Sequence, residues 1–396
     1  MSATNTGSTH WIDWRRDIHK NPELGFSETR TAAIVADALR KMGIETHEGI
    51  GGTGVVGVLR RGASERAIGL RADIDALPIQ EKNDFEYRSV HDSRFHGCGH
   101  DGHAAMLLAA AEMLVSRDSI DGSVCFIFQP DEENGRGALA MMQDGLFDRF
   151  PVDAVYGMHN MPGIPAGHFA VRQGAMMAFE DNFVISIKGL GGHASMPDRT
   201  RDPVVVAAEI ISALQTVVAR SLSPTASGVV SVTELHTDGA RNVIPSNVTI
   251  KGDTRGLSDE TQALIENRMR EIVVNVGKAH GVETTLDYSH EFIVLENTGP
   301  ETELAVQAAI DTVGADRVNA ACEPAACSED FARMLREKPG CYVLIGNGTD
   351  GHNGRPLHNP GYDFNDEVLA TGAAYWVRLA ENILADWCNR QARAPG

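Results

Sequence analysis

The chain has 396 residues, of which 42% are apolar, and its formal net charge at pH 7 is −19. This length exceeds what one compact core usually holds, so we expect two domains. The acidic surface repels phosphate groups, which excludes nucleic acids and anionic membranes as expected partners.

The N-terminal segment does not have the pattern expected of a signal peptide. Residues 1–21 lack an apolar stretch of signal-peptide length and already contain Arg15, Arg16 and Asp17. No later run is judged long and apolar enough to span a bilayer. The six cysteines follow no regular spacing, as is typical of free thiols in a protein of this size. We therefore predict a cytoplasmic protein without a membrane partner.

Strands and helices alternate in the first part of the chain. Helical patterns cover Glu28–Met42 and a segment from His100 to about Val115. Apolar runs bounded by Gly and Pro predict buried strands at Val55–Leu59, Ala67–Leu70, Val124–Phe128, Ala154–Met158 and Tyr342–Ile345. This alternation predicts a layered α/β catalytic domain with a mainly parallel sheet.

Residues 179–294 show a different order of elements. The pattern predicts, in chain order, a strand at Asn182–Lys188, a helix at Asp202–Arg220, strands at Gly228–Leu235 and Asn247–Thr254, a helix at Asp259–Ala279 and a strand at Thr284–Ile293. The order β-α-β-β-α-β is that of a ferredoxin-like α+β sandwich. We expect this domain to be inserted into a catalytic domain made of residues 1–178 and 295–396, which also includes the Asp363–Trp387 region.

The densest chemical signal is the segment His96-Gly97-Cys98-Gly99-His100-Asp101-Gly102-His103. Cys98 and His100 are two residues apart, so in an extended segment their side chains point to the same side. Thiolate and imidazole are good ligands for zinc, manganese or cobalt-like divalent ions. The alternative is a buried Cys beside a surface His cluster, and the number of such residues in one short segment disfavours it.

A second signal is the carboxylate pair Glu132 and Glu133. The pair lies where the predicted strand Val124–Phe128 ends, which is a usual position for sites in an open α/β sheet. Adjacent side chains point in different directions, so one could bind metal while the other holds a water. A water between two cations is acidified towards neutral pH, and a nearby carboxylate can take its proton. A solvated acidic turn is an equally good interpretation of these residues alone.

Four further residues are weaker candidates one by one. His159 and His358 each follow a strand-like run or a turn, and a histidine in such a place is more often structural than a ligand. Asp73 and Asp75 close a predicted strand and can face the same site, where carboxylates commonly orient metal-bound histidines. The alternative for the aspartates is an ordinary turn at the end of a strand.

His193 follows two glycines in the inserted domain, in Gly191-Gly192-His193-Ala194-Ser195. A histidine in such a mobile, exposed loop could reach a reacting carbonyl and stabilise the oxyanion. The alternative is an ordinary loop histidine.

Nine motifs follow one another along the chain: His19–Leu24, Leu70–Pro78, His96–His103, Gln129–Glu133, Gly157–His159, Gly191–Ala194, Asn242–Pro245, Ser328–Phe331 and Leu357–Pro360. In this order they resemble the metallopeptidase family that contains aminoacylases, hippurate hydrolases, N-acetyldiaminopimelate deacetylases and auxin–amino acid conjugate hydrolases. Each motif alone is a weak signature, whereas nine in the right order are specific.

The resemblance implies a catalytic centre with two divalent metal ions per subunit, of Mn, Zn, Co or Ni. The ligands that match the family are Cys98, His100, Glu133, His159 and His358, with the Cys98 thiolate bridging. Glu132 matches the general base. His193 matches a lid histidine that approaches the substrate carbonyl, often from the partner subunit of a dimer.

The resemblance also implies roles for residues around this centre. Asn242 and Arg255 lie in lid segments that help to bind substrate in relatives. Asp73, Asp75 and His103 would orient the metal ligands. The chain departs from most relatives at Asp131, where a small residue is usual.

The implied activity is hydrolysis of the amide bond of N-acyl amino acids, by a homodimer associating through its lid domain. The alternatives are a dipeptidase or an N-carbamoyl amino acid hydrolase on the same scaffold. A non-catalytic binding protein is a third interpretation; it predicts missing ligands or a missing base, yet every expected position is filled.

Overall fold

The computed structural model describes residues 8–385, which fall into two compact units. The first, which we call the large unit, comprises Met1–Met176, Glu296–Glu323 and Glu329–Gly396. The second, which we call the inserted unit, comprises Met177–Leu295 and Pro324–Ser328. Trp387, the predicted end of the C-terminal region, lies outside the described residues.

The large unit contains an eight-stranded sheet in the order β1-β2-β4-β3-β5-β16-β6-β15. The strands are β1 (Glu45–Ile50), β2 (Gly54–Arg61), β3 (Ala67–Asp73), β4 (Gly122–Gln129), β5 (Ala154–Pro162), β6 (Phe169–Ala170), β15 (Val318–Asn319) and β16 (Gly340–Gly348). The central strands β4, β3, β5 and β16 run parallel, while β1–β2, β2–β4 and β16–β6 are antiparallel. The prediction of an α/β fold with a large, mainly parallel sheet is confirmed.

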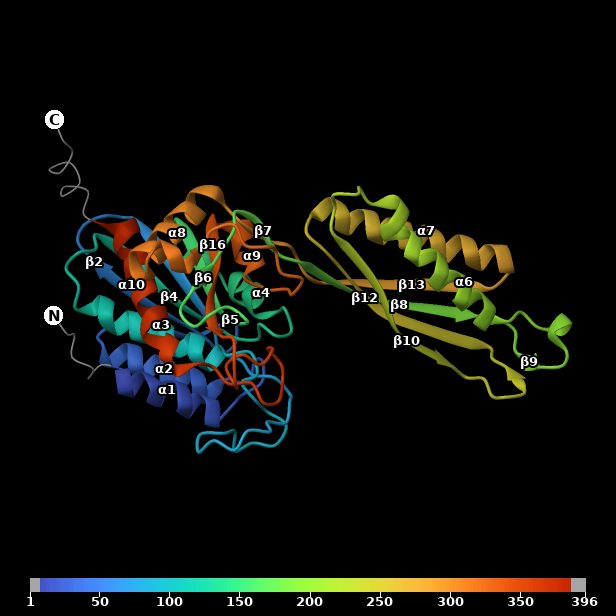
Figure 1. Ribbon diagram of the computed structural model, residues 1–396, viewed down its shortest axis with the longest axis horizontal. Helices are drawn as coiled ribbons and strands as arrows, with labels where there is room; N and C mark the ends of the chain where they lie inside the picture. Colours follow the sequence, from blue (N-terminus) through green and yellow to red (C-terminus); the bar gives the residue numbers. More distant parts are fainter. Residues whose placement is uncertain (1–7, 386–396) are drawn as a thin grey trace. The chain divides into compact units, whose positions relative to one another are not determined.

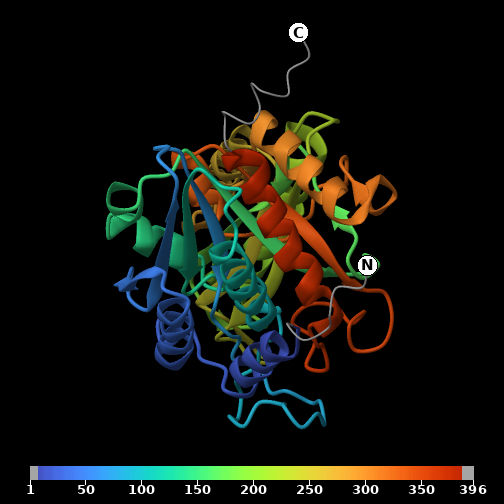
Figure 2. The same cartoon turned by 90° about the vertical axis from the view of Figure 1, so that its left-hand side faces the viewer.

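The helices of the large unit are α1 (Ser8–Lys20), α2 (Thr29–Lys41), α3 (His100–Val115), α4 (Gly137–Gln143), α5 (Leu146–Arg149), α8 (Gly299–Val313), α9 (Ala332–Glu337) and α10 (Leu369–Leu384). Helix α3 is buried over most of its length, and its middle, Ala104–Ala111, is apolar on every side. It packs against β3 and between α1 and α10, and Figure 2 shows α3 and α10 in front of the sheet. Two short strands, β7 (Gly174–Met177) and β14 (Leu295–Asn297), pair with each other.

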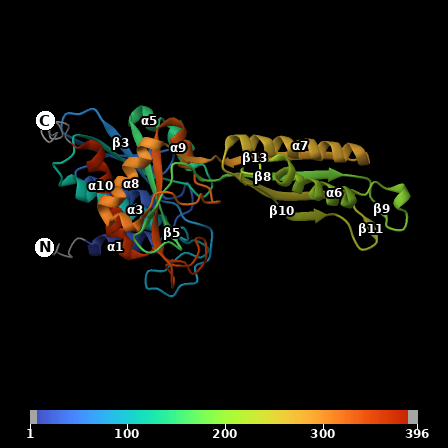
Figure 3. The same cartoon turned by 45° about the horizontal axis from the view of Figure 1, so that its top comes forward.

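The inserted unit has the element order β8 (Phe179–Lys188), α6 (Pro203–Thr216), β10 (Gly228–Thr237), β12 (Asn247–Gly256), α7 (Asp259–His280) and β13 (Glu283–Phe292). Its four strands form an antiparallel sheet in the order β10-β12-β8-β13. Alternate residues of β8 are buried, and α6 and α7 cover one face of the sheet (Figures 1 and 3). The short strands β9 (Gly192–His193) and β11 (Val243–Ile244) form a separate pair.

Helix α6 corrects one expectation from the sequence. A π-helical turn at Val217–Ser221 extends it, so that Pro203–Ser221 is long and apolar enough to cross a membrane by length and composition alone. Within its own unit, its inner side packs on the sheet through Val206, Ile210 and Leu214. That side has the pattern of a helix that covers a sheet.

Candidate metal centre

Polar side chains gather at the edge of the large sheet where three parallel strands end. Asp73, the last residue of β3, pairs in register with Gln129, the last residue of β4. His159 lies near the end of the neighbouring strand β5. Because the carboxyl ends of parallel strands share one edge, the segments that follow β3, β4 and β5 converge there.

The donor atoms of the five predicted metal ligands form overlapping groups at this edge. Within each group all donor atoms lie within 4.8 Å of one another, and the groups are Cys98–His100–His159, Cys98–Glu133–His358 and His100–Glu132–Glu133. The Sγ atom of Cys98 lies 3.4 Å from Nε2 of His159. Oε2 of Glu133 lies 3.4 Å from Nε2 of His358. Cys98 belongs to two groups, so its sulfur is placed to serve two adjacent ions.

Carbonyl and carboxylate acceptors orient two of the imidazoles. Nδ1 of His100 lies 3.0 Å from Oδ1 of Asp75, and Nδ1 of His159 lies 2.6 Å from the backbone oxygen of Asn160. These contacts assign the N–H to Nδ1 and leave Nε2 as the metal-facing atom. Nε2 of His100 and Oε1 of Glu133 are buried and have no hydrogen-bond partner among the described residues. These two atoms lie 3.9 Å apart, an arrangement that suits two ligands of one cation.

The electrostatics of the cluster also favour cations. Burial, together with the carboxylates of Glu329 and Glu133, raises the pKa of Glu132 well above its usual range. Burial raises the pKa of Glu133 to about 8, although His100 opposes the shift. Burial and both glutamates raise the pKa of the Cys98 thiol. All three shifts arise because like charges are held together away from water, a cost that divalent ions relieve.

Comparison with known proteins identifies the family. A family model described as Peptidase family M20/M25/M40 matches residues 69–382. The chain belongs to this family. Its M20 relatives include a hippurate hydrolase from Campylobacter jejuni, which is 41% identical over 370 residues and is aligned over 93% of this chain and 95% of the relative. An N-acetylcysteine deacetylase from Bacillus subtilis is 35% identical, over 95% of this chain and 97% of the relative.

Solved structures agree with the M20 assignment. A dinuclear metal binding peptidase of the M20 family from Bacillus subtilis superposes with a TM-score of 0.84 at 30% identity, over 96% of this chain and 99% of that one. An aminohydrolase from methicillin-resistant Staphylococcus aureus gives a TM-score of 0.87 at 33% identity, over 94% and 96%. The M20 chain described here is a metal-dependent amidohydrolase, and its centre suits two divalent ions.

The residues predicted to orient the M20 ligands lie next to them. Asp75 accepts the backbone N–H of Glu133 through Oδ2 at 3.0 Å, in addition to its contact with His100. His103 uses both ring nitrogens: Nδ1 lies 2.6 Å from Oδ1 of Asp73, and Nε2 accepts the backbone N–H of Asn160 at 3.0 Å. Both ring nitrogens of His103 thus contact protein atoms, although His103 also forms a group of possible metal donors with Asp73 and His100.

Sequence reasoning missed a buried ionic network beside Glu132. Arg71, fully buried in β3, contacts Asp73 at 2.7 Å, Glu329 at 2.9 Å and Asp330 at 3.1 Å. Carboxylate oxygens of Glu329, Asp330 and Glu132 lie within 4.8 Å of one another. An arginine inside an otherwise apolar strand was the available signal, because such a charge requires buried partners.

Two predicted M20 lid residues lie together within the inserted unit. His193 pairs across β9 and β11 with Val243, and the backbone oxygen of Asn242 accepts the N–H of Ala194 at 3.1 Å. The His193 ring is exposed, and its Nδ1 lies 2.8 Å from Oγ of Ser195. Among the residues that the structure describes, none forms a hydrogen bond or ion pair with Nε2 of His193, which is therefore open to a ligand.

Arg255 lies elsewhere in the same unit. It is near the end of β12, whereas Val243 and Asn242 precede the start of that strand. Eight residues of extended strand separate Asn247 from Arg255, which is roughly 26 Å at about 3.3 Å per residue. Its guanidinium contacts Glu180 at 2.7 Å, Asp253 at 2.9 Å and Ser328 at 2.9 Å. Within this unit the structure does not bring Arg255 to His193.

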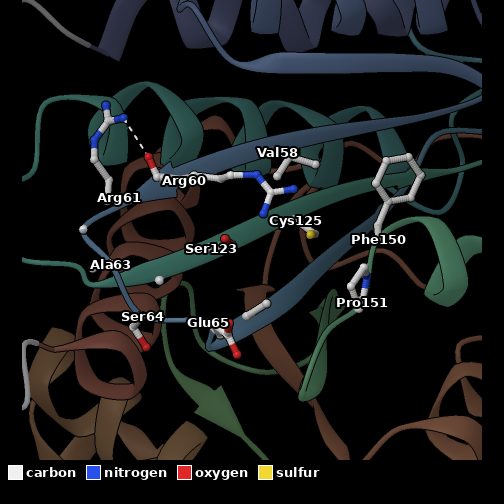
Figure 4. A pocket seen from close by; sticks show the side chains of 13 residues that line it. Val58, Arg60, Arg61, Ala63, Ser64, Glu65, Ser123, Cys125, Phe150 and Pro151 are labelled. Atoms are coloured by element: carbon white, nitrogen blue, oxygen red, sulfur yellow. Dashed lines mark hydrogen bonds between the residues drawn. The ribbon is translucent and has the colours of Figure 1, made fainter.

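One surface hollow of the large unit holds none of the predicted site residues. It has a volume of about 260 Å³ and is lined by Val58, Arg60, Ser123, Cys125 and Phe150, among others (Figure 4). Ser123 lies near the start of β4, at the opposite end of that strand from Gln129. The hollow is therefore separate from the metal centre.

Proposed function

We propose that this M20 chain hydrolyses the amide bond of N-acyl amino acids, giving a carboxylic acid and a free amino acid. The observation that carries the proposal is the position of Glu132, whose carboxylate shares one group of donor atoms with His100 and Glu133. A basic group beside a metal centre is what hydrolysis by water requires. The 41% identity to a hippurate hydrolase supports an N-acyl amino acid as the substrate.

We assign the two ions to Cys98, His100, Glu133, His159 and His358. The mixture of thiolate, imidazole and carboxylate donors suits Zn, Co, Ni or Mn better than Mg or Ca. When bound, such ions acidify water and polarise a carbonyl oxygen. Cys98 would be a ligand to both ions, because its sulfur belongs to two of the donor groups.

The protein side chains carry out the proton transfers. Glu132 takes a proton from the attacking water as the C–O bond forms. The same carboxyl group then gives this proton to the amide nitrogen as the C–N bond breaks, so the leaving amine departs neutral. His193 donates a hydrogen bond to the carbonyl oxygen while negative charge develops there.

We propose that the inserted unit is a lid that also mediates dimerisation. Its β-α-β-β-α-β order and its strand order support the predicted ferredoxin-like sandwich. The exposed position of His193 at the end of the short strand β9 supports delivery of this residue to a substrate, from its own subunit or from a partner. Asn242, beside it, is the better placed of the two predicted substrate-binding residues, and Arg255 is already engaged by two carboxylates.

A peptidase activity is the second candidate. A thermostable carboxypeptidase from Saccharolobus solfataricus is 36% identical over 380 residues, covering 93% of this chain and 95% of the relative. A peptide bond and an N-acyl amide present the same carbonyl to the centre, so the pocket for the acyl group decides between them.

A substrate panel tests the proposal. The purified chain, loaded in turn with Zn, Mn, Co and Ni, is assayed on hippurate, N-acetyl amino acids, N-carbamoyl amino acids and dipeptides. We expect the highest kcat/KM on N-acyl amino acids, with loss of activity on chelation. Preference for dipeptides by tenfold or more would establish the second candidate instead, and no turnover on any of these amides with both metals bound would refute both.

A further inference from the structure

The loop that carries Glu132 is held by carboxylates from two other segments of the large unit. The backbone N–H of Glu133 donates to Oδ2 of Asp75 at 3.0 Å. The backbone N–H of Asp131 donates to Oε1 of Glu28 at 2.9 Å. The backbone amides on both sides of Glu132 are therefore held by hydrogen bonds. Asp75, which holds Glu133, also contacts His100, whereas Glu28, which holds Asp131, has no role so far.

The backbone and the side chain of Glu28 are both held in place. Its backbone precedes helix α2, and its carbonyl accepts the N–H of Ala32 at 2.8 Å, so its position is fixed by the helix. Its side chain is fully buried. The second oxygen, Oε2, accepts the hydroxyl of Thr53 at 2.5 Å. Both carboxylate oxygens are thus used, which leaves the side chain little freedom.

The backbone that Glu28 holds adopts a conformation that most residues avoid. Asp131 has a φ of 46°, in the left-handed region, where Asp and Asn are tolerated better than other non-glycine residues. Its own Oδ1 accepts Nδ2 of Asn134 at 2.5 Å, and its carbonyl accepts the N–H of Gly137 at 3.0 Å. A residue in such a conformation persists only where its surroundings hold it.

We propose that Glu28 is a positioning residue for Glu132: by accepting the Asp131 N–H it keeps the loop after β4 in its left-handed turn and so aims the base. This inference rests on the proposed role of Glu132. The side chain of Glu28 bonds to Thr53 and to the Asp131 amide, and to no proposed metal ligand or Glu132 within the described part of the chain, so it acts through the backbone. A displacement of about 1 Å at a reacting group can cost about 100-fold in rate.

The test compares three variants of the full chain with metals loaded. Glu28→Ala removes both hydrogen bonds, and we expect kcat on hippurate to fall about 10- to 100-fold with KM nearly unchanged. Glu28→Gln keeps an oxygen for the Asp131 amide and a nitrogen for Thr53, so we expect it to restore most of kcat. Val35→Ala, at a fully buried position of the same helix α2, is the control for loss of stability alone.

A second readout does not depend on the substrate. Hydrogen exchange of the peptide that contains Asp131 should be faster in Glu28→Ala than in Val35→Ala, and should be close to wild type in Glu28→Gln. The proposal is overturned if Glu28→Ala keeps wild-type kcat, or if kcat and exchange in Glu28→Ala change no more than in a Val35→Ala protein of matched stability. If wild type hydrolyses no amide, the proposed function fails, and the exchange measurement still decides whether Glu28 holds the loop.

Discussion

Glu132 combines burial, neighbouring carboxylates and a position among the metal-ligand groups. The two adjacent glutamates have different proposed roles. Only the carboxylate of Glu133 lies in a group of donor atoms with both Cys98 and His358. At the scale of single residues, the proposed mechanism therefore separates binding of metal from transfer of protons.

Glu132→Gln should lose about 100- to 10,000-fold in kcat, the range that general acid–base catalysis usually supplies. The amide has the same shape but cannot take a proton. Metal content, measured by elemental analysis, should stay at the wild-type value because the proposed ligands are unchanged. A variant with intact metals and near wild-type kcat would remove Glu132 from the role of base.

His193→Ala should lose about 100- to 1,000-fold in kcat, as expected for one oxyanion donor. The ring is exposed, so the free energy of unfolding should change little. His236→Ala is the matched control, since His236 is an exposed histidine of the same unit that pairs with Glu234. Equal kcat in the two variants would contradict the role given to His193.

Glu28 should make the stability of the large unit depend on pH. Burial raises the pKa of Glu28 to about 7, despite the hydrogen bond from Thr53. The folded protein thus binds this proton more tightly than the unfolded chain, so the stabilisation is complete below pH 4.5 and is lost as pH rises through 7. Glu28→Gln should remove this loss, on the order of 2 kcal/mol between pH 5 and pH 8. Urea unfolding of both proteins at those pH values measures it, and parallel pH curves would contradict it.

At the scale of elements, the short helix α4 closes the loop that follows β4. Gly137, its first residue, approaches the chain so closely that an added Cβ would lie 1.5 Å from the backbone oxygen of Pro130. Because that oxygen belongs to the main chain, it cannot move aside without moving the loop that carries Glu132 and Glu133. The start of α4 and the geometry of the carboxylate pair are thus linked.

Gly137→Ala should lower both stability and kcat. Forcing an atom into packed structure typically costs about 1–3 kcal/mol, and the displaced loop should reduce kcat further. Gly43→Ala is a suitable comparison, because Gly43 has a φ of 76° but no atom within 4 Å of an added Cβ. It should lose about 1 kcal/mol of stability and keep kcat. Urea midpoints and steady-state rates on hippurate provide the check, and unchanged kcat in Gly137→Ala would show that the loop is not coupled to α4.

At the scale of the whole molecule, the metal centre joins segments from both ends of the large unit. His358 lies about 200 residues after His159 in the chain, and the inserted unit falls between them. Ions bound by the proposed ligands would therefore tie together parts of the fold that the chain connects only through a long path.

Removal of the metals should destabilise the protein. An ion present at 100 to 1,000 times its Kd contributes about 3–4 kcal/mol, which corresponds to roughly 10 °C in Tm for a unit of this size. Thermal unfolding before and after dialysis against a chelator, with readdition of Zn or Mn as the control, measures the effect. A Tm that does not respond to either treatment would argue against the centre as a structural link.

Much of the fold follows from local patterns, and the exceptions have a physical cause. The strands β3 and β4 are buried throughout, and their apolar stretches were predicted within two or three residues of the observed bounds. Helix α1 was missed because charged residues occupy its buried side: Arg15 contacts Asp101, and His19 contacts Asp101 and Glu81. Their partners lie far along the chain, so no local pattern could identify this side as buried.

Some residues of the site could likewise be predicted from local spacing, and others could not. Cys98 and His100 lie two residues apart and could be recognised locally, whereas Glu133, His159 and His358 became credible only through the order of motifs. Nothing in the sequence was a reason to predict a role for Glu28, because its partner Asp131 lies 103 residues later and only the fold brings the two together. Contacts between residues that only the fold brings together could not be predicted from the spacing of residues in the sequence.

The interior position of β16 has a consequence for synthesis on the ribosome. β16 lies between β5 and β6, yet roughly 180 residues separate it from β5 in the chain. At translation rates of about 5–20 residues per second, β5 waits roughly 10–35 s with one edge open to non-native pairing. His358 emerges later still. The nascent chain therefore acquires the complete proposed ligand set only after the inserted unit and β16 have been made, so metal capture by that set follows their synthesis.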